Sequence, residues 1–162
     1  MRRRRIGLQE ARRVLAGAAL TVLLSPLAHA TVSSCTVSAS GVAFGTYAAD
    51  SPSALTSTGT ISVACTVPSG SNAVTVALST GSSGSFGTRT LTSGANSLIY
   101  NLYLNAVYTQ LWGNGTSGTL TETTSVTHTQ PRFTNTVYGQ IPALQDVPAG
   151  TYTDTITVTV SY

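Results

Sequence analysis

The clearest strand pattern in the chain lies in its last residues, Tyr152-Thr153-Asp154-Thr155-Ile156-Thr157-Val158-Thr159-Val160-Ser161-Tyr162. From Thr155 onward every second residue is a threonine or serine, and those between are aliphatic or aromatic. Successive side chains of a β-strand point to opposite faces, so this period of two predicts a strand running unbroken over residues 152–162. One of its faces carries Ile156, Val158, Val160 and Tyr162.

The same alternation recurs upstream, in residues 61–67, 74–79 and 98–104. Turn-forming stretches rich in Gly, Ser and Asn separate these runs. Short strands with turns at this spacing predict an all-β sandwich or barrel. Residues 117–129 are rich in threonine and weakly patterned, and we interpret them as an edge strand or a long loop.

The C-terminal strand has no following hairpin partner in the sequence, which predicts an unpaired sheet edge. An exposed apolar edge is a template for strand addition by another chain. The alternative is that an N-terminal strand of the same chain covers this edge. The sequence leaves both possibilities open.

The first thirty residues have the pattern of a secretory signal peptide. Six arginines precede an apolar run over residues 14–24, and Ala28-His29-Ala30 places small residues at positions −3 and −1 of a cleavage site. The apolar run is short of the ~20 residues that span a bilayer as a helix, which argues against the alternative of a retained membrane anchor. We therefore expect a signal peptide over residues 1–30, one mature domain over residues 31–162 and no membrane span after cleavage.

Removal of this leader reverses the net charge. The leader holds six arginines and Glu10, whereas the mature part holds Arg89 and Arg132 against four acidic residues and has no lysine. The mature charge is therefore −2, and no basic patch remains that would neutralise the phosphates of a nucleic acid. We expect no nucleic-acid partner.

Two cysteines, Cys35 and Cys65, remain in the mature part. An even number of cysteines in an exported chain predicts one disulfide. Two free thiols are the weaker alternative in an oxidising compartment. A metal site is weaker still, because two sulfurs and one distant histidine do not complete a tetrahedral shell.

Catalytic chemistry has almost no candidates. His128 is the single mature histidine, and no carboxylate lies near it in sequence. The alternative is a glycosidase pair, which would require folding to bring two of the four scattered acidic residues together. We expect no enzyme activity, no cofactor and no metal.

Several aromatic residues lie close together in the sequence. Tyr and Trp offer large amphipathic contact areas, so Tyr108 and Trp112 are candidates for a surface-binding patch. The alternative for this group, which also includes Tyr100 and Tyr103, is packing within the sandwich.

Several short motifs, in order along residues 35–162, resemble the spore coat protein U family, whose domains are subunits of archaic chaperone–usher pili. The matching motifs include Cys35-Thr36-Val37-Ser38-Ala39, Val42-Ala43-Phe44-Gly45-Thr46-Tyr47, Gly59-Thr60-Ile61-Ser62-Val63-Ala64-Cys65, Tyr100-Asn101-Leu102-Tyr103, Val137-Tyr138-Gly139-Gln140-Ile141-Pro142 and Pro148-Ala149-Gly150-Thr151-Tyr152-Thr153-Asp154-Thr155.

The resemblance implies an incomplete immunoglobulin-like β-sandwich, pilin-like, that lacks its final strand and carries one disulfide between the two family cysteines. It implies that a periplasmic chaperone and then another pilin subunit fill the open groove, with assembly at an outer-membrane usher. Ile156, Val158, Val160 and Tyr162 would border that groove. The chain would pass through the periplasm to a surface pilus that supports adhesion or biofilm formation.

The chain departs from this family in one respect. Rod subunits of the family carry a donor extension of about a dozen residues before the first cysteine, whereas only residues 31–34 separate the expected cleavage site from Cys35. Four extended residues span roughly 13 Å, less than a typical strand. We therefore expect a subunit that accepts a strand and supplies none, as at a pilus tip. The alternative is a self-standing secreted coat or surface-binding adhesin without a pilus.

Overall fold

The computed structural model describes residues 32–162, so the predicted signal peptide and its cleavage site lie outside the described residues. The described part is all-β, with one short 3-10 turn and no α-helix. None of its elements is a helix long and apolar enough to cross a bilayer. The strands are β1 (Ser34–Ser40), β2 (Leu55–Thr66), β3 (Ser71–Leu78), β4 (Arg89–Ser93), β5 (Asn96–Tyr103), β6 (Glu122–Thr127), β7 (Arg132–Ile141) and β8 (Val158–Ser161), and the 3-10 turn is η1 (Gly81–Ser83).

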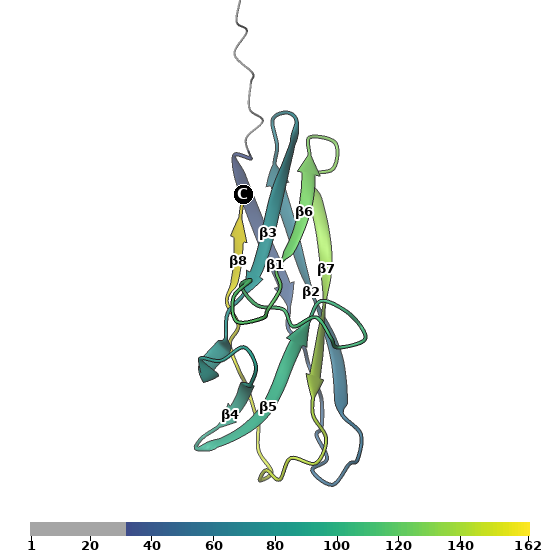
Figure 1. The fold of residues 1–162 in the computed structure, drawn as a ribbon, viewed down its shortest axis with the longest axis vertical. Coiled ribbons are helices and arrows are strands. Elements are labelled where there is room, and N and C mark those ends of the chain that lie inside the picture. The colour runs from purple at the N-terminus through teal and green to yellow at the C-terminus, as the bar shows by residue number, and fades with distance from the viewer. Residues whose placement is uncertain (1–31) are drawn as a thin grey trace, which may run out of the picture.

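The strands form two facing sheets (Figure 1). One has the order β1-β2-β7-β5-β4 and the other has the order β6-β3-β8. Every strand pairing in both sheets is antiparallel. The predicted immunoglobulin-like sandwich is confirmed. Residues 117–129 include β6, which is an edge strand, one of the two alternatives that the sequence left open.

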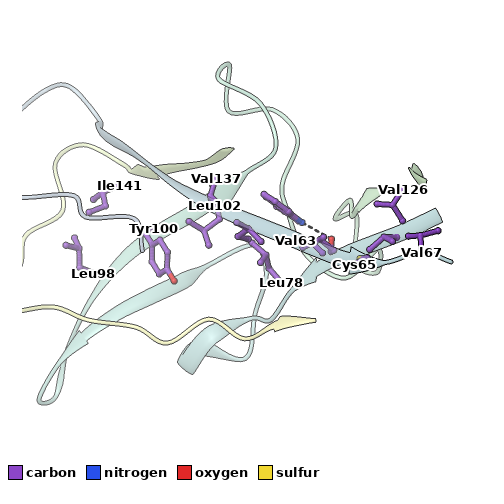
Figure 2. Packing of buried hydrophobic residues seen from close by; sticks show 14 residues of the cluster. Val63, Cys65, Val67, Leu78, Leu98, Tyr100, Leu102, Val126, Val137 and Ile141 are labelled. Atoms are coloured by element: carbon purple, nitrogen blue, oxygen red, sulfur yellow. Dashed lines mark hydrogen bonds between the residues drawn. The ribbon is translucent and has the colours of Figure 1, made fainter. Parts of the chain in front are cut away.

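The core follows from the period of two. Ile61, Val63 and Cys65 alternate with more exposed residues of β2, and Val74, Val76 and Leu78 do the same in β3. Figure 2 shows buried side chains from both sheets gathered between them. Burial of each large aliphatic side chain stabilises the fold by roughly 1.5–3 kcal/mol.

The two cysteines form the predicted disulfide, Cys35–Cys65. They are direct partners in the register of β1 against β2, so the bond joins neighbouring strands. Closing a loop with a sequence separation of 30 residues contributes about 3–4 kcal/mol on the chain-entropy account. The disulfide thus fixes β1, which has only one strand neighbour, to the sheet.

The prediction of one unbroken strand over residues 152–162 is wrong. Only Val158–Ser161 form a regular strand, β8, while Thr153 pairs separately with Thr92 of β4. The segment changes partner because it crosses from one sheet to the other between these two points. Period-two alternation shows which side chains point inward, and it holds through this crossing although the strand does not.

Candidate functional site

The inner face of β1 is left uncovered by the described residues. Val37 lies opposite Val63 and Ala39 opposite Ile61, and directly opposed residues share one face of a sheet. Val63 and Ile61 are only 1% and 2% exposed, whereas Val37 is 43% exposed and Ala39 is exposed as well. The sheet therefore carries core-facing apolar side chains on β1 with nothing packed over them.

The C-terminal segment borders the same opening from the other sheet. β8 pairs with β3 on one side only, and β1 pairs with β2 only, so each is the edge of its sheet. In Figure 1 β8 lies in front of β1, with the two strands bordering one side of the sandwich. Ile156, Val158 and Val160 are half-buried against the core, whereas Tyr162 is 58% exposed.

A cavity of about 230 Å³ opens between these two edges. Its floor consists of buried core residues from both sheets, including Ile61, Leu78 and Val137. Of the four groove residues predicted from the sequence, Ile156 and Val158 line this cavity, and Val160 and Tyr162 do not. The remaining lining residues are Ala39, Ser40, Gly41, Val42, Phe44, Leu91, Tyr100, Leu102 and Asp154.

A second cavity, of about 670 Å³, continues toward the far end of the sandwich. One of its walls is formed within residues 42–49 and the other by residues 147–154. It shares Val42, Phe44, Leu91 and Asp154 with the first cavity, so the two adjoin. We call them together the edge groove, bounded by residues 39–49 and 147–158. This groove extends past β8 along most of the C-terminal segment.

Two glycines allow the first wall to lie close to the sheet. A Cβ atom at Gly139 of β7 would stand 2.6 Å from a methyl of Val42 and 2.7 Å from the ring of Phe44. A Cβ at Gly59 of β2 would stand 2.7 Å from the carbonyl oxygen of Ser40. Any larger residue at these positions would push the wall outward, so these glycines help to shape the groove.

Asp154 is the one charged side chain among the described residues that line the groove, and it lines both cavities. Its Oδ1 accepts hydrogen bonds from the backbone N–H groups of Ser82 at 2.9 Å and Thr155 at 2.8 Å, and its Oδ2 accepts one from the Tyr100 hydroxyl at 2.7 Å. A side chain at Gly81 would collide with this carboxylate. The carboxylate is therefore held in one position.

Burial, together with the hydrogen bond to Asp154, raises the pKa of Tyr100 far above its ordinary value. Tyr100 is 3% exposed and thus remains a protonated donor to the carboxylate. Its ring also meets that of Phe44 edge to face, with ring centroids 5.9 Å apart. Tyr100 therefore contacts both the carboxylate of Asp154 and the ring of Phe44 in the groove wall.

Arg89 lies near Asp154 and Tyr100 and is fully buried. Its guanidinium donates to the carbonyl oxygen of Ser79 at 2.8 and 3.1 Å and to that of Trp112 at 2.7 Å. Burial lowers the pKa of Arg89, and the nearby Tyr100 and Asp154 counteract that effect. Two hydrogen bonds join Ser79 to Thr157. The Ser79 N–H donates to the carbonyl oxygen of Thr157 at 3.0 Å, and the Thr157 N–H donates to the hydroxyl oxygen of Ser79 at 2.9 Å. Arg89 thus anchors the crossing of the C-terminal segment.

The prediction that Trp112 belongs to a surface-binding patch is wrong. It is fully buried, and its indole N–H donates to the carbonyl oxygen of Val76 at 3.1 Å. The core-packing alternative applies to Trp112 because its large ring fills the space between the sheets. Tyr108 is half-buried and rests edge-on against Tyr103, beside Val107, which is 71% exposed. A surface-binding role for Tyr108 stays a prediction.

Sequence reasoning missed Asp154, Tyr100 and Arg89 as parts of one network. The alternation over residues 152–162 does indicate that Asp154 points inward. The contacts among Asp154, Tyr100 and Arg89 were not predictable, because they depend on tertiary folding.

Within residues 32–162 no group of three or more His, Cys, Asp or Glu side chains is arranged to hold a metal. The Nδ1 atom of His128 lies 3.0 Å from the carbonyl oxygen of Val67.

The Spore Coat Protein U domain model matches residues 19–159, and the chain belongs to this family. Comparison with curated proteins gives no significant match. Among solved structures, a similar chain occurs in the CsuC–CsuE chaperone–tip adhesion subunit pre-assembly complex from the archaic chaperone–usher Csu pili of Acinetobacter baumannii. The two share 22% identity with a TM-score of 0.54 over 80% of this chain. The match spans 40% of the length of that other chain.

Proposed function

We propose that this protein is a structural subunit of a chaperone–usher surface pilus, assembled by donor-strand complementation. The observation that carries the proposal is the edge groove. Core-facing side chains of β1 are exposed although their partners in β2 are buried, and the groove runs between the free edges of β1 and β8. One added strand between these edges would complete the sandwich and cover both rows of apolar side chains.

The partners follow from the same proposal. A periplasmic chaperone would lend the first strand, another pilin subunit would replace it, and an outer-membrane usher would receive the complex. The family membership and the fold shared with the Csu pilus complex support this assignment. The chain would function at the cell surface in a structural role, with adhesion or biofilm formation as the outcome.

We further propose that the subunit accepts a strand and supplies none, as at a tip. The support is the closeness of β1, which begins at Ser34, to the cleavage site expected after Ala30. A self-standing coat or adhesin protein is the alternative outcome of the test below.

The direct test is periplasmic expression of the chain with and without a chaperone of an archaic usher system. We expect a stable one-to-one complex with the chaperone, and degradation or aggregation without it. A monomer that is soluble and heat-stable without a chaperone would contradict the proposal and favour the self-standing alternative.

A further inference from the structure

The edge groove has one charged side chain in its lining, Asp154, beside apolar residues such as Leu91 and uncharged polar residues such as Ser40 and Thr153. Asp154 lies where the two cavities adjoin, with Leu78 lining one of them and Leu98 the other. Three hydrogen bonds fix its carboxylate, so it cannot turn away when a strand enters. A strand that follows the groove past the junction of the two cavities would therefore place a side chain against it.

The carboxylate has unused capacity as an acceptor. An ionised carboxylate has about four lone-pair sites, and three hydrogen bonds occupy sites on Asp154. Oδ2, which accepts only from Tyr100, retains one. An apolar side chain lying over it would remove water from that site without replacing the hydrogen bond, which is unfavourable.

The charge of Asp154 already has a compensating cation nearby. Buried Arg89 interacts electrostatically with both Tyr100 and Asp154. A second cation brought into the groove by the incoming strand would be repelled by Arg89 as well as attracted by Asp154. A neutral hydrogen-bond donor satisfies the free site without this repulsion.

We infer that Asp154 sets the register and the specificity of the inserted strand. The incoming strand carries a neutral donor side chain, Ser, Thr or Asn, at the one inward position that faces Asp154, and apolar residues at its other inward positions. A shift of register by two residues would place an apolar residue on the carboxylate and the polar residue on the apolar floor. This inference rests on the proposed strand-acceptor function.

The test fuses a donor strand to the C-terminus of the full chain. A short turn after Tyr162 lets the added strand run back antiparallel to β8 along the groove. Starting from an all-Val set of inward positions, each position is changed in turn to Ser, Thr, Asn or Lys, and the melting temperature is measured. We expect one position at which Ser, Thr or Asn raises the melting temperature above Val, by about 3–6 °C, and at which Lys does not. At every other inward position the polar residues should lower it.

The outcomes separate the two proposals. If none of the fused strands raises the melting temperature, the strand-acceptor function itself fails. If the all-Val strand stabilises the chain but no position prefers a neutral donor, only the register inference fails. A position where Lys exceeds Ser, Thr and Asn would overturn the choice of a neutral donor.

A variant gives a second check. Asp154→Ala removes the acceptor that faces the groove and leaves neither a donor nor an acceptor side chain in its place. We expect the preference for Ser or Thr over Val to shrink by at least half in this background. An unchanged preference would overturn the role of Asp154, and if the variant does not fold, the scan in the unmodified chain decides alone.

Discussion

At the scale of single residues, the polar side chains behind the groove explain how a half-open sandwich keeps its C-terminal segment in place. Arg89 holds the carbonyl oxygen of Ser79, Ser79 holds Thr157, and Tyr100 holds Asp154. Arg89, Ser79, Tyr100 and Asp154 are buried or half-buried, where an unsatisfied partner is costly, whereas Thr157 is exposed. The segment is thus fixed by hydrogen bonds where it has few strand contacts.

Arg89→Met should destabilise the fold strongly. The change leaves the carbonyl oxygens of Ser79 and Trp112 without this donor in a buried setting, and we expect a loss of roughly 2–4 kcal/mol in the free energy of unfolding. Urea denaturation of the chain completed by a fused strand measures it. The matched control is Arg132→Met, because Arg132 is the other arginine among the described residues and its side chain is exposed. Equal losses in the two variants would refute the anchoring role of Arg89.

Tyr100 should make the fold sensitive to alkali. Its pKa is raised in the folded state, so the unfolded chain loses this proton first as the pH rises. The stabilising contribution is complete below the ordinary tyrosine pKa of about 10 and is lost progressively above it. We expect the free energy of unfolding to fall between roughly pH 10 and 11.5, and to fall less steeply in Tyr100→Phe. Parallel slopes in the two proteins would contradict the assigned environment of Tyr100.

At the scale of elements, β1 and the C-terminal segment define the groove from opposite sheets. The alternation of β1 places Val37 and Ala39 on the inner face and Ser38 on the outer face. Ala39 would therefore face an inserted strand, whereas its neighbour Ser38 would face away from it. This arrangement supplies a matched pair of variants.

Ala39→Glu should block strand insertion, whereas Ser38→Glu should not. The first change puts a carboxylate where an inserted strand would bury it, which is strongly unfavourable, and the second keeps it in water. In the chain with a fused donor strand, we expect Ala39→Glu to remove most of the rise in melting temperature and Ser38→Glu to leave at least four-fifths of it. Equal effects of the two variants would argue against insertion beside β1.

The sequence predicted the elements better than their contacts. The all-β class, the disulfide and the inward positions Ile156 and Val158 follow from local alternation and cysteine count, which are visible along the chain. The break in the last strand was not predictable in this way, because it results from the pairing of Thr153 with Thr92 of a distant strand. Trp112 was ambiguous for the same reason, since burial of an aromatic residue depends on the facing sheet.

At the scale of the whole molecule, the fold is a sandwich with one side open. The described residues form five strands against three, and the free edges of β1 and β8 border the same groove. β6 is also a free edge, but none of its residues lines the groove. The position between the free edges of β1 and β8 is therefore the one that we propose for an added strand.

A donor strand grafted before Cys35 should convert the chain into a polymer. We proposed that the chain accepts a strand and supplies none, so the unmodified mature chain should form no head-to-tail assemblies. Adding about a dozen residues of alternating apolar and polar character ahead of Ser34 gives each copy a strand for the groove of the next. Size-exclusion chromatography should show a ladder only for the grafted chain. A ladder formed by the ungrafted mature chain would contradict the acceptor-only proposal.

Hydrogen exchange of the chain with and without a donor strand fused beyond Tyr162 shows whether an added strand lies between β1 and β8. We predict that the added strand slows exchange in peptides covering residues 34–41 and 153–162, because it lies between the free edges of β1 and β8. The free edge β6, at residues 122–127, serves as an internal control and should exchange as before. Protection at β6 instead, or no protection at β1 and the C-terminal segment, would contradict the account.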